Sequence, residues 1–303
     1  MVERRIVSPG HEDYPENLMR LPDPPEGLYV AGSIVPQDRV AVAIVGTRYP
    51  TPVGKLVAQE MAEDMASAGV TVVSGLARGI DGIAHRAAIR AGGRTIACLG
   101  CGIDVVYPRE NEDLFRDIPV SGAILSEYGD GTKPLKHHFP RRNRIIAGLS
   151  LGVVVVEAGL RSGALNTAAW ALHYGIPVMA VPGSARSPKS AGTNRLIQEG
   201  AYLVTSAQDV LSFLGRESEC IPVSRGSPER HGSEHTLEES AVLQELRAEP
   251  LSADDLCERL AGISAGRVAA LLARLEMKGA VLRTPAGKFL ALAGQARNGK
   301  ERS

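Results

Sequence analysis

The chain has 303 residues, of which 44% are hydrophobic, 22% are charged and 4% are aromatic. It carries 34 basic and 34 acidic residues, so its net charge gives no attraction to a polyanion, and a role with nucleic acid requires a local basic patch. There is no apolar run of about 18 residues and no apolar leader, and four cysteines are too few for a disulfide framework. We therefore expect a cytoplasmic globular protein without a membrane span.

Residues 1–39 are rich in proline and are expected to form a partly extended lead-in that packs on the next segment of the chain. Residues 40–214 alternate apolar strand-like runs with helical stretches, which predicts a doubly wound, mostly parallel α/β sheet. Most of the runs are continuously apolar, as expected for strands covered on both faces. The predicted strands are Val40–Val45, Val70–Ser74, Thr95–Leu99, Ala123–Ser126, Val153–Glu157, Pro177–Val181 and Ala201–Val204.

The carboxyl-terminal part of the chain has a different pattern. Residues 215–235 are polar, contain Gly, Pro and Ser, and are expected to form a flexible linker. Residues 236–295 contain three short helical patterns, with Ser252 and Ser264 as N-caps, followed by two short strands around "TPAGK". Three helices followed by a hairpin predict a small winged-helix domain, and residues 296–303 are expected to be a frayed tail.

Glycine-containing loops follow the predicted strands. In a doubly wound sheet, ligands bind at the carboxyl ends of the strands, and backbone N–H groups in such loops suit phosphates. The loop near Lys55 is not a Walker A motif, because Leu56 stands where Ser or Thr is needed, and "GCGIDV" lacks the third glycine of a dinucleotide fingerprint. We therefore expect a phosphate-binding rim but no cofactor. The loops are "VGTRYPTPVG", "SGLARGIDGIAH", "LGCGIDVVYP", "SEYGDGTKPLKHHFPRRNR", "EAGLRSGALNTA" and "VPGSARSPKSAGTN".

The segment 133–144 concentrates positive charge without a single acid. In "FPRRNRIIAGLS", Pro140 is well placed to open a helix and Gly148 to end it. Arginines in a first helical turn oppose the helix dipole, so a negative partner is expected, and a nucleic-acid backbone is favoured over a solvated charged face. Phe139 lies among the cations and can stack on an unpaired base. The basic residues are Lys133, Lys136, Arg141, Arg142 and Arg144.

Weaker candidates lie in the other loops. Arg48 and Arg78 follow the first two strands of the predicted parallel sheet, and each can reach a phosphate or pair with a local acid. Ser162, with Gly163, opens a helix and can be either a phosphate contact or an N-cap.

Three residue pairs are candidates for catalysis or for metal binding, but no nucleophile or metal-ligand set accompanies them. We therefore favour structural roles for these pairs and expect no enzymatic activity and no metal site. The pairs are Asp81 with His85, Glu127 with Glu157, and Cys98 with Cys101.

These motifs together resemble the DNA-processing protein A (DprA/Smf) family, from about Tyr14 to Leu214, and the carboxyl-terminal module resembles the winged helix of many members. The resemblance implies a Rossmann-like domain that binds single-stranded DNA without catalysis. It also implies a homodimer formed through that domain, which loads the RecA recombinase onto incoming DNA during natural transformation and homologous recombination. The protein would thus protect incoming DNA in a competent cell.

The resemblance assigns the DNA-binding pocket to Arg48, Lys136, Phe139 and the "RNR" motif at 142–144, with glycine loops donating N–H groups to phosphates. One departure is Ala164, which replaces the second hydroxyl of the family's Ser-Gly-Ser. The complete expected DNA-binding set is Arg48, Gly75, Arg78, Lys133, Lys136, Phe139, Arg141, Arg142, Asn143, Arg144, Ser162, Gly163 and Asn194.

Two other functions fit the sequence less well. A nucleotide phosphoribohydrolase of the lysine-decarboxylase-like group would share the fold, but its "PGGxGTxxE" signature is missing. A transcription factor would need a basic winged helix, yet residues 236–292 contain eight acids and seven bases. We therefore interpret the winged helix as a module for protein contact or weak duplex binding.

Overall fold

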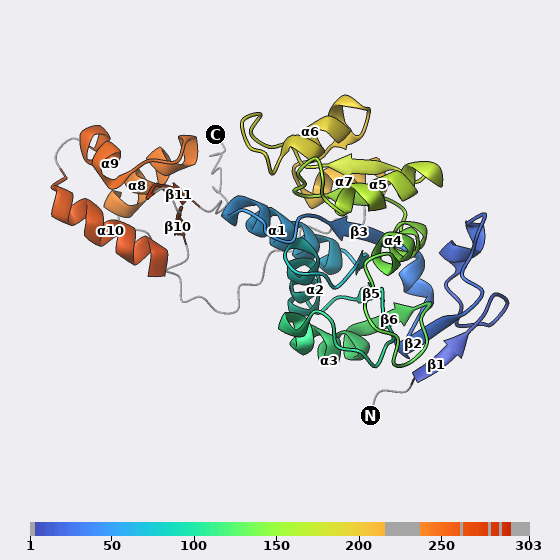
Figure 1. Ribbon diagram of the computed structural model, residues 1–303. Helices are drawn as coiled ribbons and strands as arrows, with labels where there is room; N and C mark the ends of the chain where they lie inside the picture. The colour runs from blue at the N-terminus through green and yellow to red at the C-terminus, as the bar shows by residue number, and fades with distance from the viewer. Residues whose placement is uncertain (1–3, 216–236, 261–262, 278–279, 285–286, 292–303) are drawn as a thin grey trace, which may run out of the picture. The chain divides into compact units, whose positions relative to one another are not determined.

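The computed structural model describes residues 4–215, 237–260, 263–277, 280–284 and 287–291, which form two compact units divided near residue 225 (Figure 1). The first unit is built on one sheet with the strand order β1-β2-β6-β5-β4-β3-β7-β8-β9. Its strands are β1 (Arg4–Val7), β2 (Leu28–Gly32), β3 (Ala41–Val45), β4 (Thr71–Ser74), β5 (Thr95–Leu99), β6 (Gly122–Ser126), β7 (Val153–Val155), β8 (Val178–Ala180) and β9 (Tyr202–Leu203).

The seven strands from β3 to β9 pair in parallel, which confirms the predicted doubly wound sheet. The residues of β3 to β8 are all buried, because helices cover both faces, and this burial explains their continuous apolar sequence. The chain runs outward from β3 through β4 and β5 to β6, then returns to place β7 on the other side of β3. The topological switch point therefore lies between β3 and β7.

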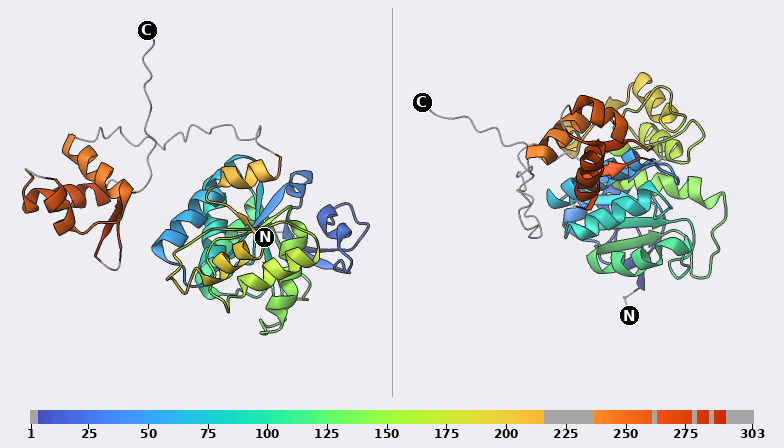
Figure 2. Two further views of the ribbon diagram at one scale, coloured as in Figure 1. Left: turned by 90° about the horizontal axis from the view of Figure 1, so that it is seen from above. Right: turned by 90° about the vertical axis from the view of Figure 1, so that its left-hand side faces the viewer.

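Two helical layers enclose the sheet (Figure 2). The cores on the two faces contain different alternate residues of the same strands, for example Val73 on one face and Val72 on the other. One face is covered by α1 (Pro52–Ser67), α2 (Ile80–Arg90), α3 (Glu112–Ser121) and α7 (Ala207–Phe213). The opposite face is covered by η1 (Glu16–Arg20), α4 (His138–Leu149), α5 (Ala164–His173) and α6 (Ala191–Gln198).

The lead-in forms part of the sheet, which the sequence pattern did not show. Strand β1 pairs antiparallel with β2, and β2 pairs antiparallel with β6 through the partners Tyr29 and Ser126. The buried Asn17 side chain donates hydrogen bonds to the carbonyls of Arg39 and Leu149, at 3.1 and 2.7 Å. The first 39 residues thus extend the β6 edge and fasten the carboxyl end of α4.

The second unit has the predicted three helices and hairpin, α8 (Leu237–Ala248), α9 (Ala253–Arg259), α10 (Ala265–Met277), β10 (Val281–Arg283) and β11 (Phe289–Ala291). Ser252 caps α9 by accepting from the Asp255 amide, whose carboxylate in turn accepts from Ser252 N–H. Leu246, Leu256 and Leu275 are fully buried in a core of its own. The predicted linker from residue 216 onward and the tail 296–303 lie outside the described residues. Among the helices of the described ranges, none is long and apolar enough to cross a membrane.

Candidate nucleic-acid interface

A groove opens at the carboxyl ends of the parallel strands, beside the switch point. It consists of a small pocket of about 120 Å³ and a larger one of about 580 Å³. We call the two together the strand-end groove. The small pocket extends toward the loop after β5, and the larger pocket toward the amino end of α5. Both pockets are lined by Arg48, Tyr49, Ala77, Phe139 and Arg142.

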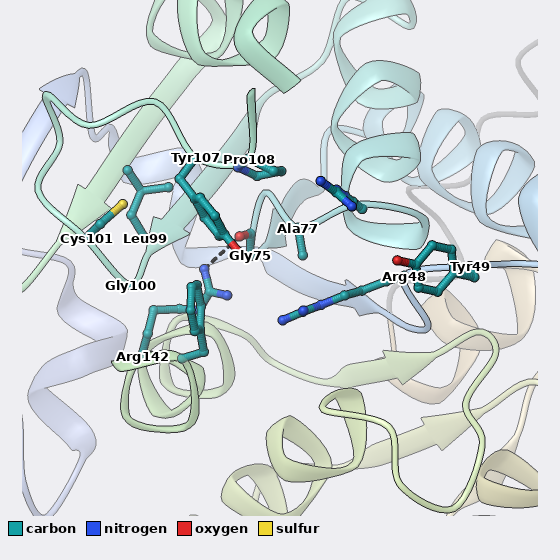
Figure 3. A pocket seen from close by; sticks show the side chains of 12 residues that line it. Arg48, Tyr49, Gly75, Ala77, Leu99, Gly100, Cys101, Tyr107, Pro108 and Arg142 are labelled. Atoms are coloured by element: carbon teal, nitrogen blue, oxygen red, sulfur yellow. Dashed lines mark hydrogen bonds between the residues drawn. The ribbon is translucent and has the colours of Figure 1, made fainter. Parts of the chain in front are cut away.

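Phe139 stands at the centre of the strand-end groove. Its half-buried ring lies 6.0 Å from the Arg48 Cζ and 5.9 Å from the Arg142 Cζ, distances at which a guanidinium interacts with an aromatic face. The Tyr107 ring is tilted against it, with 5.7 Å between the ring centroids. A Cβ at Gly100 would lie 3.0 Å from the Phe139 ring, so a glycine lets the ring pack closely against this loop. In Figure 3, Arg48 extends into the pocket toward Arg142.

Arg142 forms the floor of the strand-end groove. Only 5% of it is exposed, and its guanidinium donates to Gly75 O at 2.7 Å, a bond drawn in Figure 3. It also donates to Cys98 O and to Asn143 Oδ1, the latter at 3.3 Å. Gly75 directly follows β4 and Cys98 is the penultimate residue of β5, so Arg142 links the carboxyl ends of these two neighbouring strands. A Cβ at Gly75 would lie 2.6 Å from Arg142 Nη2, so the guanidinium fits only against a glycine.

Asp81 and His85 complete the buried polar layer under the groove. Asp81 accepts from Gly75 N–H at 3.1 Å, and burial raises the pKa of its carboxyl. His85 Nε2 accepts from Leu76 N–H at 3.3 Å, so Nδ1 carries the proton and donates to Thr95 Oγ1 at 2.6 Å. Burial lowers the pKa of His85 to about 3, which keeps the ring neutral. Both residues hold the loop after β4, as their predicted structural roles require.

Arg144 has its negative partner inside the protein. It is 6% exposed and forms an ion pair with Glu127, while its Nη1 donates to Asp23 O at 2.7 Å. Arg141 is exposed and lies 3.9 Å from the same Glu127 carboxylate. For Arg144 and Arg141, the negative partner that we expected in a nucleic-acid backbone is instead a protein acid, which comes from the end of β6. Both side chains line a separate pocket, away from the strand-end groove.

The predicted limits of helix α4 also need correction. The helix begins at His138 and ends at Leu149, so Pro140 lies inside the first turn and Gly148 lies inside the last. Proline is tolerated there because the first N–H groups of a helix have no helical acceptor. A Cβ at Gly148 would meet the Leu21 side chain at 2.5 Å. Gly148 thus allows close packing of the lead-in and does not end the helix.

The structure brings part of the expected DNA-binding set together. Gly75 and Arg78 line the small pocket, and Asn143, Ser162 and Gly163 line the large one. Arg78 is exposed but forms an ion pair with Glu110. The expected residues that line neither pocket are Lys133, Lys136, Arg141, Arg144 and Asn194.

The two lysines and the asparagine in this group, unlike the two arginines, form no ion pair among the described residues. Lys133 and Lys136 lie on the loop before α4, where both are exposed. Asn194 Oδ1 accepts from Gly183 N–H at 3.0 Å, and its amide donates to Gly183 O at 2.9 Å. Asn194 therefore shapes the loop after β8.

Four groove residues were missed by the sequence reasoning. Tyr49 and Tyr107 line the small pocket, and Arg161 and Lys189 line the large one. All four stand in the glycine-containing loops after the predicted strands, and their aromatic or basic character is the signal in the sequence that marks them. Lys189 Nζ donates to Tyr49 O at 2.6 Å, which ties the loop after β8 to the loop after β3.

The remaining candidates for catalysis or metal binding are hydrogen-bonded or buried in ways that stabilise the fold. Glu157 accepts from the Thr51 amide at 3.2 Å and from the Thr51 hydroxyl at 2.5 Å, at the start of α1. Burial raises the pKa of the Cys98 thiol to about 12 and that of Cys101 to about 11, so both stay protonated. Within the part of the chain that the structure describes, no cluster of three or more His, Cys, Asp or Glu side chains is arranged to hold a metal ion.

The fold and the groove define a Rossmann-like α/β protein with a carboxyl-terminal winged helix. Residues 5–215 match the family model for DNA recombination-mediator protein A, and residues 226–287 match the model for the DprA winged helix domain. The chain belongs to the DNA recombination-mediator protein A family.

Three known proteins illustrate the relationship. Protein Smf of Escherichia coli is 38% identical over 287 residues, which are 93% of this chain and 76% of that protein. Protein Smf of Synechocystis is 43% identical over 215 residues, and the match covers 70% of this chain but only 54% of that relative. DNA processing protein A of Helicobacter pylori, whose solved structure is described as giving insight into a single-stranded DNA binding mode, is 33% identical with a TM-score of 0.64. That match covers 71% of this chain and 97% of the other.

Proposed function

We propose that the chain is a non-enzymatic single-stranded DNA-binding protein that holds the strand in the strand-end groove. One observation carries this proposal. Arg48 is an exposed cation at the groove, beside the half-buried ring of Phe139, and it takes part in none of the ion pairs among the described residues. An arginine without a carboxylate partner next to an aromatic face is suited to a phosphate and an unpaired base.

The other residues of the groove and of the adjoining loop contribute in different ways to the proposed binding. Phe139 stacks on a base, Arg48 binds the adjacent phosphate, and N–H groups near Gly163 face the backbone. Gly75 shapes the groove instead, because its N–H donates to Asp81. Lys133 and Lys136 attract the strand from the loop before α4. Arg142 supports Phe139 from below and contacts DNA little, because carbonyls already occupy its donors. The single-stranded DNA binding ascribed to the Helicobacter relative supports this assignment.

The wider role follows from the family. We propose that the protein is cytoplasmic, forms a homodimer through its first unit and loads the RecA recombinase onto single-stranded DNA during recombination and natural transformation. The description of the family as a DNA recombination mediator supports this role.

Catalysis is disfavoured because the polar groups near the groove are buried or already hydrogen-bonded within the protein. A general base must reach its substrate and must change protonation near the working pH. His85 is fully buried with both ring nitrogens hydrogen-bonded, and Glu157 accepts a hydrogen bond from the Thr51 hydroxyl. The "PGGxGTxxE" signature of the phosphoribohydrolase alternative is also missing from the chain. Binding without turnover is therefore the function that the groove supports best.

Titration of labelled oligo-dT against the full chain tests the proposal. Arg48→Ala should weaken binding about tenfold and reduce the slope of log affinity against log salt by about 0.7, the value for one lost phosphate contact with a single strand. Arg195→Ala is the matched control, since that exposed arginine is paired with Glu199 at 2.7 Å. Equal affinity of the wild-type and Arg48→Ala proteins would remove the groove from the binding site.

A further inference from the structure

The loop that carries Lys133 and Lys136 is fastened at both ends. Residues 127–137 connect β6 to α4 and contain neither helix nor strand. Long lysine side chains on a free loop would sample many positions and would lose entropy on binding a strand. Contacts that fix this backbone therefore matter for how the two lysines are presented.

The first fastening is made by Asp104. Its Oδ1 and Oδ2 both accept from Gly131 N–H, at 2.8 and 2.9 Å. The amide of Gly102 donates to Thr132 O at 3.0 Å beside it. Gly131 has φ +76°, a conformation that other residues adopt only with strain. Since a Cβ at Gly102 would lie 2.7 Å from Gly129 O, the two loops are in close backbone contact.

The second fastening lies just after Lys136. His138 Nδ1 donates to Gly100 O at 3.0 Å, and the His138 ring stacks on Tyr128 with 4.0 Å between centroids. The amide of His138 donates to Leu135 O at 3.0 Å. Lys133 and Lys136 thus lie between two attachments to the same loop, residues 100–104, which also lines the small pocket through Gly100 and Cys101.

We propose that Asp104 is a positioning residue for DNA binding, because its carboxylate fixes the 129–132 turn and so holds Lys133 and Lys136 beside the strand-end groove. The proposal rests on the proposed function of this groove. Asp104 itself is exposed and negative, so it has no direct attraction for phosphate. Its contribution is the orientation of the lysine loop.

The charge of Asp104 makes the proposal decidable. Removing a carboxylate near a polyanion site should strengthen binding if electrostatics alone decides. Asp104→Asn keeps the size of the side chain but loses the charge and one of the two oxygens that accept from Gly131 N–H. If these hydrogen bonds, which we call the clamp, position the lysine loop, the substitution should weaken DNA binding. Asp130→Asn is the matched control. Asp130 adjoins Gly131, its side chain is 58% exposed, and its carboxylate lies 3.9 Å from Arg4.

Oligo-dT titration and amide hydrogen exchange on the full chain test the clamp together. Asp104→Asn should weaken oligo-dT binding roughly fivefold, a change within the range of coupled neighbouring residues, whereas Asp130→Asn should bind as well as wild type or better. The Gly131 amide should exchange faster only in Asp104→Asn. In a Lys133→Ala, Lys136→Ala background, the effect of Asp104→Asn on affinity should disappear.

Each contrary result has a distinct meaning. Unchanged exchange at Gly131 in Asp104→Asn overturns the clamp, whether or not the protein binds DNA. Faster exchange with unchanged affinity, or an effect that persists without the lysines, overturns the positioning role. Wild-type protein that fails to bind oligo-dT overturns the proposed function, and the exchange measurement then still decides the clamp.

Discussion

The floor of the strand-end groove and the winged-helix unit use arginine in opposite ways. Arg142 is buried, and its donors go to main-chain carbonyls at the ends of two strands. In the winged-helix unit, Arg259 pairs with Glu249 at 2.6 Å and Arg267 pairs with Glu238 at 2.6 Å, with all four side chains at least 40% exposed. The number of arginines in a segment therefore does not measure its affinity for an anion. The partners and the exposure of each one decide it.

This difference predicts unequal energetic consequences. Removal of a buried guanidinium leaves its acceptors without a donor and out of contact with water. The protein then loses stability by the full desolvation free energy of those acceptors. An exposed ion pair is replaced by water and contributes little. Substitutions at Arg142, His85 and Arg267 test the difference, from the largest expected effect to the smallest.

The largest effect is expected from Arg142→Ala. The change leaves Gly75 O and Cys98 O without this donor and leaves Asp81 buried without the Arg142 charge, so the free energy of unfolding should fall by about 3 kcal/mol. Urea unfolding followed by circular dichroism measures it. Arg142→Lys should lie between the two proteins, because an ammonium replaces only part of the fork. A loss below about 1 kcal/mol would contradict a buried floor.

The next effect is a loss of stability in acid that depends on His85. Its pKa is lowered from 6.5 to about 3 in the folded chain, so below about pH 6.5 the unfolded chain binds a proton that the folded chain does not. Between neutral pH and about pH 5.5, stability should therefore fall by roughly 1.4 kcal/mol. His85→Gln should lack this component in urea titrations at several pH values. Parallel pH profiles of the two proteins would contradict the buried neutral ring.

The smallest effect is expected from Arg267→Ala in the winged-helix unit. Its ion pair with Glu238 is open to solvent, so the free energy of unfolding should change by no more than about 0.5 kcal/mol. Oligo-dT affinity should stay within a factor of about two, since this arginine is already paired. A tenfold loss of affinity would place a DNA contact in the winged helix and would show that an exposed, paired arginine still binds DNA.

The fold was largely predictable because its signals are local. Continuous apolar runs mark buried parallel strands, and the Ser252 capping box marks a helix start. Strands β1 and β2 were not predictable in this way. The pairing of β2 with β6 joins segments almost one hundred residues apart, and in β1 Ile6 is exposed while its neighbour Val7 is buried. Such short edge strands give no long periodic pattern.

The location of the candidate site was predictable, but the interaction partners of its residues were not. The carboxyl edge of the sheet follows from topology, and Arg48 and Phe139 do lie there. The environment of Arg144 was not predictable, because Glu127 and Asp23 reach it from other segments of the chain. In isolation, helix α4 would lack a counter-charge for its arginines, whereas in the folded protein tertiary contacts supply one.

The attachment of the lead-in has a consequence for synthesis on the ribosome. Strand β2 needs β6 as its partner, and Asn17 bonds to Leu149 O across 132 positions in the chain. The lead-in is synthesised before α4 and therefore completes its structure only after α4 has emerged. At about 5–20 residues per second, synthesis of the 132 positions takes roughly 7 to 26 seconds. During that time, the apolar lead-in residues Leu18 and Leu28, fully buried in the finished protein, have no native surface to cover them.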